Sequence, residues 1–418
     1  MSAGLVSPRH RRQRPGRGVP SSRPRSAAPP ASCSYVKGER QGPEAPMWCC
    51  SALYRQVRQA YEGVTTDLPT PTSGRPSDRF FSPSPVHVRE GSTMPDDKTV
   101  QEIVADATVA PSMHNAQPWC FRFLRDGAVL ELRADFSRAM PASDPAHRAL
   151  HIGCGAALFN VRVAAAHAGL AARPTLLPDP ADPALLAAVG LSQGPGKDED
   201  LAPLHPAIPR RHTSRYPFAE QSLSTAERVA LADAAEREGV IPLFPSAWHL
   251  ELLLDLMHDA EGRENLHQGR RRDLARWTRV GTSEADTATE GVPEHAFGPR
   301  KRDGRAPARD FADRRPVADR GSTAFESHPN LLLLGTPEDR PADWLRTGQA
   351  MQRVLLRATL DGLATSPTSH ALEWSDLREL VRDPTSSVAF VHMVLRIGHG
   401  PQGPRTGRRP VREVLQFV

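Results

Sequence analysis

The chain contains, at residues 110–119, the sequence Ala110-Pro111-Ser112-Met113-His114-Asn115-Ala116-Gln117-Pro118-Trp119, a predicted connection between a helix and a strand. Apolar residues before it recur at helical spacing, at Val100, Ile103, Val104 and Ala107. Pro111 should end this helix, because the residue before a proline is disfavoured in the α conformation. Large rings then alternate at Trp119, Phe121 and Phe123, which predicts a half-buried strand.

Short polar side chains are concentrated in this connection. Asn115 and Gln117 each offer N–H donors and a carbonyl acceptor on a planar amide, a combination that suits the edge of a planar heterocycle. The alternative is an ordinary polar loop, in which Ser112, Asn115 and Gln117 only satisfy backbone groups. Composition alone favours the second interpretation.

Two further segments are basic. Residues 210–215 contain three arginines and two hydroxyls, and guanidinium groups bind phosphate oxygens in a bidentate manner. This predicts a phosphate cradle, with a solvated basic turn as the alternative. Residues 405–409 form the second basic segment, for which a solvated tail is the alternative.

The connection resembles a segment of the nitroreductase family, the FMN-dependent flavoproteins, in which Pro-Ser-x-x-Asn-x-Gln-Pro-Trp recurs. Its fuller form, with alanine before and histidine inside, resembles the Acg-like branch, in which two nitroreductase-like halves are fused. Residues 210–218 resemble the family's Arg-Arg-Ser-x-Arg-x-Phe segment, with Thr213 where serine is common. Residues 405–415 resemble its closing basic, proline-containing segment.

The resemblance implies one FMN per chain, bound between the two halves, and it implies a role for each segment. The implied flavin contacts are Ser112, Asn115 and Gln117. The implied phosphate ligands are Arg210, Arg211, Thr213 and Arg215, with Arg408 as a second clamp. Residues 364–373 occupy the place of the loop near flavin N5, which implies Ser369 and His370 at the reactive edge. Their residue types depart from the family's Pro-x-Glu-Gly form.

The resemblance also implies an α+β fold, with two tandem nitroreductase-like halves forming a pseudo-dimer and antiparallel-dominated sheets flanked by helices. A glycine- and proline-rich stretch at 192–200 suggests a boundary, with halves at 94–200 and 201–418. Residues 267–328 are charged and weakly periodic, which is typical of a lid or a disordered insertion. In the Acg-like branch such an insertion resembles a lid over the flavin.

Local patterns predict most elements of the second half. Ser224 and Glu227 form a capping box for a helix to about residue 238, and a second amphipathic helix follows at 248–266. Residues 330–336 and 390–398 predict buried strands, and a long helix is expected from Pro341 to residue 362. We predict a helix–turn–helix connection at 364–373. In the first half, Gly153 and Gly155 should allow close helix–helix contact.

The basic excess of the chain lies entirely in residues 1–93. This leader has fourteen Lys and Arg against six Asp and Glu, whereas the whole chain has a net charge of only +5. The body therefore gives no electrostatic reason to expect nucleic acid or a membrane surface as a partner. We also expect no stretch long enough to span a bilayer. The leader is proline-rich and predicted to be disordered, and Met94 is a plausible alternative start of translation.

Few residues suggest metal or disulfide chemistry. Cys120 and Cys154 are isolated in the body, which predicts free thiols and a cytoplasmic location. His147 and His151 are spaced to share a metal, but no further ligand accompanies them, so we predict none.

The expected activity is electron transfer from NAD(P)H through FMN to a small electrophile, such as a nitroaromatic or a quinone. The competing hypothesis is a non-catalytic flavin-binding or flavin-sequestering protein, in which residues 267–328 close over the site. A third possibility is a structural remnant that binds no flavin. The fused chain is expected to act as a monomeric pseudo-dimer or a homodimer.

Overall fold

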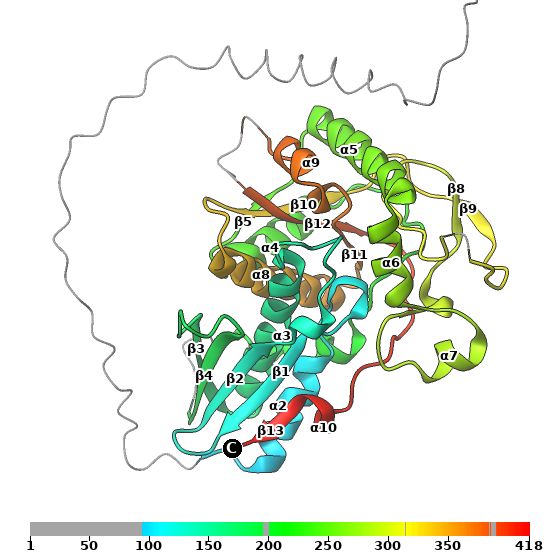
Figure 1. Cartoon of the computed structure of the whole chain (residues 1–418). Helices are drawn as coiled ribbons and strands as arrows, with labels where there is room; N and C mark the ends of the chain where they lie inside the picture. The colour runs from blue at the N-terminus through cyan, green and yellow to red at the C-terminus, as the bar shows by residue number, and fades with distance from the viewer. Residues whose placement is uncertain (1–93, 195–199, 314, 384, 386–389) are drawn as a thin grey trace, which may run out of the picture. The chain divides into compact units, whose positions relative to one another are not determined.

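The computed structural model describes residues 94–194, 200–313, 315–383, 385 and 390–418 (Figure 1). The predictions for the leader at 1–93 and for most of the linker at 192–200 lie outside these residues. The rest forms two mixed or antiparallel sheets with helices between and around them. The predicted α+β class is therefore confirmed.

The first sheet has five strands in the order β13-β1-β2-β4-β3. Its strands are β1 (Trp119–Leu124), β2 (Val129–Ala134), β3 (Leu170–Leu176), β4 (Leu185–Gln193) and β13 (Leu415–Phe417). The predicted alternation in β1 is confirmed, because Trp119, Phe121 and Phe123 are all buried. β13 comes from the far end of the second half and pairs in parallel with β1, with Leu415 opposite Phe121.

The second sheet is antiparallel, with four strands in the order β11-β12-β10-β5. Its strands are β5 (Ile241–Leu243), β10 (Leu331–Thr336), β11 (Ala364–Thr368) and β12 (Phe390–Gly398). The helix–turn–helix connection predicted at 364–373 was wrong, because residues 364–368 are the edge strand β11. Its polar, proline-containing sequence carries no strand pattern, and pairing with the buried β12 determines its conformation. Pro367 is tolerated at a sheet edge.

Helices join the two sheets. They are α2 (Asp97–Thr108), α3 (Arg148–His167), α4 (Thr225–Glu236), α5 (Ala247–Leu266), α8 (Pro341–Leu360), α9 (Ser375–Leu380) and α10 (Val411–Val414). α3 contacts the first sheet, α8 contacts the second, and the two helices pack against each other (Figure 1). The site described below is built at this junction.

A pair of glycines allows the two central helices to approach closely. A Cβ at Gly155 would collide with the carbonyl oxygen of Leu345, and a Cβ at Gly348 would collide with that of Ile152. Counted from Arg148 and Pro341, the two glycines occupy the same position in helices of 20 residues each. The predicted close contact at Gly155 is therefore confirmed, and the crossing is pseudo-symmetric.

α3 also corrects one expectation from the sequence. By length and composition it is apolar enough to cross a membrane, although we expected no such stretch. Most of the helix is buried inside the protein, between the first sheet and α8. This is the position of a core helix, and its apolar composition is explained by burial on all sides.

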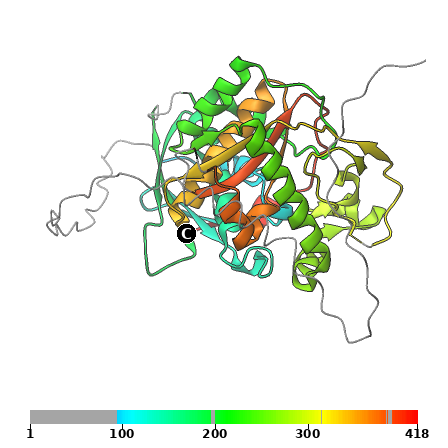
Figure 2. The same cartoon turned by 90° about the horizontal axis from the view of Figure 1, so that it is seen from above.

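The described residues of 267–328 are folded, and they lie to one side of the sheets (Figure 2). They form α6 (Gln268–Arg276), β6 (Thr278–Arg279), α7 (Thr282–Thr287), β7 (Val292–Pro293), β8 (Arg300–Asp303) and β9 (Ser322–Ala324). A small apolar cluster holds them together, with Leu274, Val292, Phe297 and Phe311 among its buried members. We call this segment the lid.

Candidate functional site

Two adjoining cavities lie where the first half, the second half and the lid meet. The larger measures about 920 Å³ and the smaller about 400 Å³, both including their open mouths. Pro111, Ser112, Thr213 and Arg215 line both cavities, so the two adjoin each other. The connection at 110–119 and the basic segment at 210–215 therefore meet as predicted.

The 110–119 connection holds an unusual backbone conformation. His114, Asn115 and Gln117 have positive φ angles of 49°, 55° and 52°. Non-glycine residues adopt this left-handed conformation infrequently and at a cost, so surrounding contacts must hold it. One such contact is local, because the backbone N–H of Gln117 donates to the Ser112 hydroxyl oxygen at 2.9 Å. The Ser112 hydroxyl proton therefore remains available to a ligand.

The two carboxamides of the connection bind backbone groups of distant segments. Asn115 Nδ2 donates to the carbonyls of Gly291 and Gly407, at 2.9 and 3.1 Å. Asn115 lines only the smaller cavity, and its Oδ1 is buried without a partner in the described chain.

Gln117 Nε2 donates to the Thr289 carbonyl at 2.7 Å, and Gln117 Oε1 accepts from the Arg409 amide at 2.9 Å. Gln117 lines neither cavity. Gln117 therefore fits the alternative interpretation, in which the polar side chains of the connection only satisfy backbone groups. Its hydrogen bonds link the connection to the lid and to the C-terminal segment.

Uncompensated positive charge surrounds the smaller cavity. Arg211, Arg215 and Arg408 line it, and none of the three forms an ion pair with a described carboxylate. Burial lowers the pKa of Arg211 to about 10. Burial, with the neighbouring Arg211 second, lowers the pKa of Arg408 to about 9. Burying unpaired charge is expensive, so these cations call for an anionic partner.

The hydrogen-bonding capacity of these arginines is also unfilled. Nε and Nη1 of Arg211 and Nε of Arg408 are buried without a hydrogen-bond partner in the described chain. The Thr213 and Thr406 side chains lie at the same cavity. A phosphate group offers several anionic oxygens to such donors, so the residues present fit the phosphate of FMN.

Arg210 is not part of this constellation. Its side chain is exposed and lines neither cavity. Among the described residues, this side chain makes one hydrogen bond, a long contact of 3.5 Å to the Thr359 carbonyl. Residues 202–210 form a 3-10 helix, which directs successive side chains to different sides. The adjacent Arg211 is the residue that turns inward.

Ser369 and His370 line the larger cavity, as the resemblance implies. The Ser369 hydroxyl donates to Glu373 Oε1 at 2.7 Å. His370 Nδ1 lies 2.7 Å from the Thr368 hydroxyl oxygen. Burial, followed by the charge of Arg309, holds the pKa of His370 well below its usual value.

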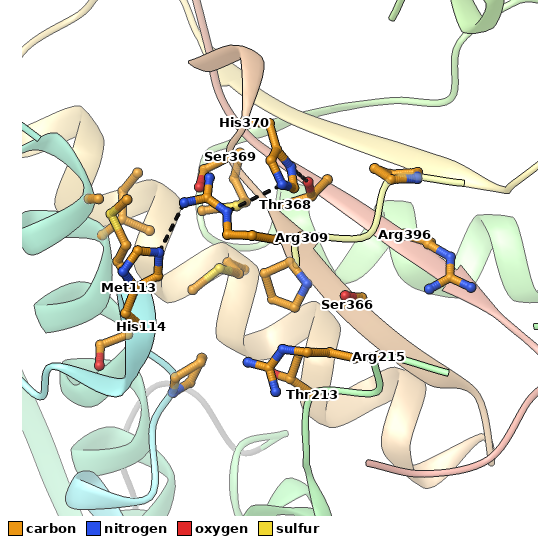
Figure 3. A pocket seen from close by; sticks show the side chains of 18 of the residues that line it. Met113, His114, Thr213, Arg215, Arg309, Ser366, Thr368, Ser369, His370 and Arg396 are labelled. Atoms are coloured by element: carbon orange, nitrogen blue, oxygen red, sulfur yellow. Dashed lines mark hydrogen bonds between the residues drawn. The ribbon is translucent and has the colours of Figure 1, made fainter. Parts of the chain in front are cut away.

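Sequence analysis missed Arg309, although its side chain extends into the larger cavity between His114 and His370 (Figure 3). It comes from the lid and pairs with Glu264 and Glu373. His114 was part of the recognised motif but was not singled out. No local pattern marks Arg309, which is one of many charged residues in a weakly periodic segment.

A second unpredicted pair lies at the wall of the larger cavity. Arg396 of β12 forms a bidentate ion pair with Glu326, and both side chains are almost fully buried. The Arg396 guanidinium also stacks over the Phe218 ring, 3.8 Å from its centroid. Because Glu326 neutralises Arg396, the larger cavity has less excess positive charge than the smaller one.

In the described part of the chain, no group of metal-binding side chains is clustered closely enough to hold an ion.

The unpaired arginines lead to a first prediction. Inorganic phosphate alone should raise the melting temperature of the FMN-free protein, because binding to the folded state stabilises it. Chloride at equal ionic strength should not. A thermal-shift series on wild type and Arg408→Gln would measure the effect, which should shrink in the variant. Equal shifts in the two proteins would remove the anion site from this position.

The chain is similar to several named proteins. No protein-family model matches the chain. A Mycobacterium tuberculosis protein with the provisional name NAD(P)H nitroreductase is 31% identical over 331 residues, covering 77% of this chain and 92% of its own length. Another from the same organism, provisionally named NAD(P)H nitroreductase Acg, is 30% identical over 357 residues and is covered to 98%.

Among solved structures, a provisionally named nitroreductase from Anabaena variabilis aligns with 74% of this chain and 90% of its own. Its sequence identity is 11% and its TM-score is 0.41. This likeness is too distant to support an argument about the site.

Proposed function

Because this chain belongs to the nitroreductase family, in its Acg-like branch, we propose that it binds FMN and transfers electrons from NAD(P)H to a small electrophile. Nitroaromatics and quinones are the proposed acceptor classes. The observation that carries the proposal is the pair of adjoining cavities, one with uncompensated buried cations and the other with an apolar and hydrogen-bonding wall.

In this proposal the phosphate and the ring system of FMN occupy different cavities. Arg211, Arg408 and Thr213 would hold the phosphate in the smaller cavity. The ring system would lie along the larger one, beside Ser112 and Ser369. When bound, the flavin supplies the two-electron chemistry, so the protein need only bind, orient and exclude water.

The walls of the larger cavity suit this orienting role. Met351 of α8 and Ile152 and Gly153 of α3 give it an apolar side formed by the two central helices. These helices cross in close backbone contact at Gly155 and Gly348, so the wall has no gap at the crossing that a side chain could fill. Hydroxyl groups of Ser112, Ser366 and Thr368 supply the polar side.

An anaerobic titration tests the proposal. The full chain, loaded with FMN, is titrated with NADPH and then with NADH while the flavin absorption is recorded. We expect bleaching that is reversed by a nitroaromatic or a quinone. Bleaching by dithionite without bleaching by either nucleotide would contradict catalysis. Failure to bind FMN would contradict the cofactor assignment itself.

One observation favours a second candidate function, flavin sequestration. The lid is bound to both halves: Asn115 and Gln117 donate to lid carbonyls, and Arg215 Nη1 donates to the Ala296 carbonyl at 2.8 Å. A lid held at several points would shield a bound ring from nicotinamide and acceptor alike. The same titration separates the two functions, since a sequestered flavin would respond to dithionite alone.

The location and assembly of the protein are part of the proposal. The free thiols of Cys120 and Cys154 support a reducing, cytoplasmic setting. The lining residues of the two cavities come from both halves of the chain, which supports the proposal of a monomeric pseudo-dimer. A homodimer is equally compatible with this arrangement.

A further inference from the structure

We propose that Arg309 of the lid is a positioning residue, which fixes His114 and His370 as neutral imidazoles protonated at Nδ1. In this state His114 and Thr368 become hydrogen-bond donors beside the larger cavity. The three side chains and Arg309 are seen together in Figure 3. The inference about the imidazoles depends only on the protein and not on the proposed cofactor.

His370 accepts a hydrogen bond from Arg309. A guanidinium group carries only donors, so any ring nitrogen that it binds must be an unprotonated acceptor. Arg309 Nε donates to His370 Nε2 at 3.2 Å. The proton of the neutral ring must therefore be on Nδ1, which lies 2.7 Å from the Thr368 hydroxyl oxygen.

This direction of donation leaves the Thr368 proton available. Because the Thr368 oxygen accepts from His370, its own O–H must donate elsewhere. No other hydrogen bond of this hydroxyl is present within the described chain, and Thr368 lines the larger cavity. A directional chain thus runs from Arg309 through His370 to Thr368 and ends at the ligand position.

His114 follows the same logic on the opposite side of Arg309. Arg309 Nη1 lies 3.0 Å from His114 Nε2, so this nitrogen must also accept. His114 Nδ1 then carries the proton, and it is buried without a partner in the described chain. Edge-on packing against Phe311, with ring centroids 5.5 Å apart, fixes the orientation of the ring.

The surrounding charges keep Arg309 in place. Arg309 pairs with Glu264 of α5 and with Glu373, which follows β11. Other charged groups that act on Arg309 or on the two imidazoles are Glu261, Lys301, Arg215 and Arg270. Burial and the Arg309 charge both lower the pKa of the two imidazoles, in agreement with the neutral state that the geometry requires.

The consequence for the ligand rests on the proposed function. A hydroxyl donor from Thr368 at the larger cavity, with no unpaired acceptor in its hydrogen-bond chain, favours a ligand with electron-rich oxygen atoms. Carbonyl and nitro oxygens are of this class. Stabilising negative charge on such an oxygen as electrons arrive is the role that preorganised donors perform best.

Long-range proton–nitrogen NMR correlation spectra of the full chain, labelled with ¹⁵N-histidine, test the tautomers directly. His114→Gln and His370→Gln assign the two rings among the 16 histidines. We expect both rings to be neutral and protonated at Nδ1 from pH 8 down to pH 6. A ring protonated at Nε2, or a charged ring in this pH range, would overturn the inference. This test uses the wild-type lid and needs no variant at Arg309.

Variants at Arg309 then test its causal role. Arg309→Lys keeps the charge but offers one nitrogen in place of a fork, so at least one ring should lose its fixed tautomer. Arg305→Lys is the matched control, because this lid arginine is partly exposed and pairs with Glu251 and Asp255 away from the cavities. Spectra unchanged in Arg309→Lys would show that other contacts fix the rings and would overturn the proposal.

A kinetic readout separates this inference from the proposed function. In FMN-loaded wild-type protein, kcat/KM for a quinone should be independent of pH between 6 and 8. In Arg309→Lys, kcat/KM should instead change with pH as a histidine with a pKa of about 6.5 titrates. Absence of flavin reduction would contradict the proposed function, while the NMR spectra still decide the tautomers. Normal flavin reduction together with rings protonated at Nε2 would contradict only the proposed role of Arg309 in fixing the two imidazoles.

Discussion

Arg211→Ala is expected to weaken FMN binding by about 2–3 kcal/mol, the scale of lost charge-assisted hydrogen bonds. This corresponds to roughly 30- to 150-fold in Kd. The Arg211 side chain is almost fully buried at the smaller cavity, and two of its nitrogens have no partner in the described chain. A bound phosphate could accept hydrogen bonds from these unused Arg211 donors. Titration of FMN fluorescence with purified protein measures the effect.

Two comparisons make this prediction specific. Arg210→Ala changes the neighbouring arginine, which is exposed and lines neither cavity, and it should leave Kd within about twofold. Riboflavin, which has no phosphate, should bind wild type and Arg211→Ala with similar affinity. Equal losses for FMN and riboflavin would mean that Arg211 supports the fold, and they would remove it from the phosphate site.

Gly155→Ala is expected to destabilise the protein by about 3 kcal/mol, near the upper end for an added methyl in a packed interior. The new Cβ would meet the backbone carbonyl of Leu345, which cannot rotate away as a side chain can. The two central helices would have to separate. Denaturant unfolding monitored by circular dichroism measures the loss. FMN affinity should fall too, because Ile152, Gly153 and Met351 on these helices line the larger cavity.

Gly262→Ala provides the matched control. Gly262 lies within α5, and no atom lies within 4 Å of the position that its Cβ would take. Alanine is the better helix former by about 1 kcal/mol, so this variant should gain stability. Opposite signs for the same chemical change would confirm the close crossing. A stable Gly155→Ala protein would show that the helices are farther apart than described.

Local sequence patterns predicted the elements whose stability is local. The apolar spacing before Pro111, the capping box at Ser224 and the consecutive leucines from Leu331 all mark elements that the structure contains. Each signal arises from neighbours within one or two turns or along a single strand. The motif resemblance added the site residues, and Ser112, Thr213 and Arg215 do meet at one place.

Elements that depend on distant partners escaped prediction. β11 has a loop-like sequence and becomes a strand because it pairs with β12, about 30 residues further along the chain. β13 is only three residues long and pairs with β1 from the opposite end of the body. Arg309 likewise acquires its partners, His114, Glu264 and Glu373, only through the folded arrangement.

The pairing of β13 with β1 has a consequence for the time order of synthesis. Residues 119–193 leave the ribosome long before residues 415–417, so the first sheet waits for its fifth strand while the second half is being made. Arg408, the proposed phosphate clamp, arrives just before that strand. If the chain binds FMN as proposed, capture of the cofactor would therefore be a late event in the synthesis of the chain. A ribosome that stops short of residue 408 releases a protein without its clamp and with an unpaired strand edge, a ready target for proteolytic removal.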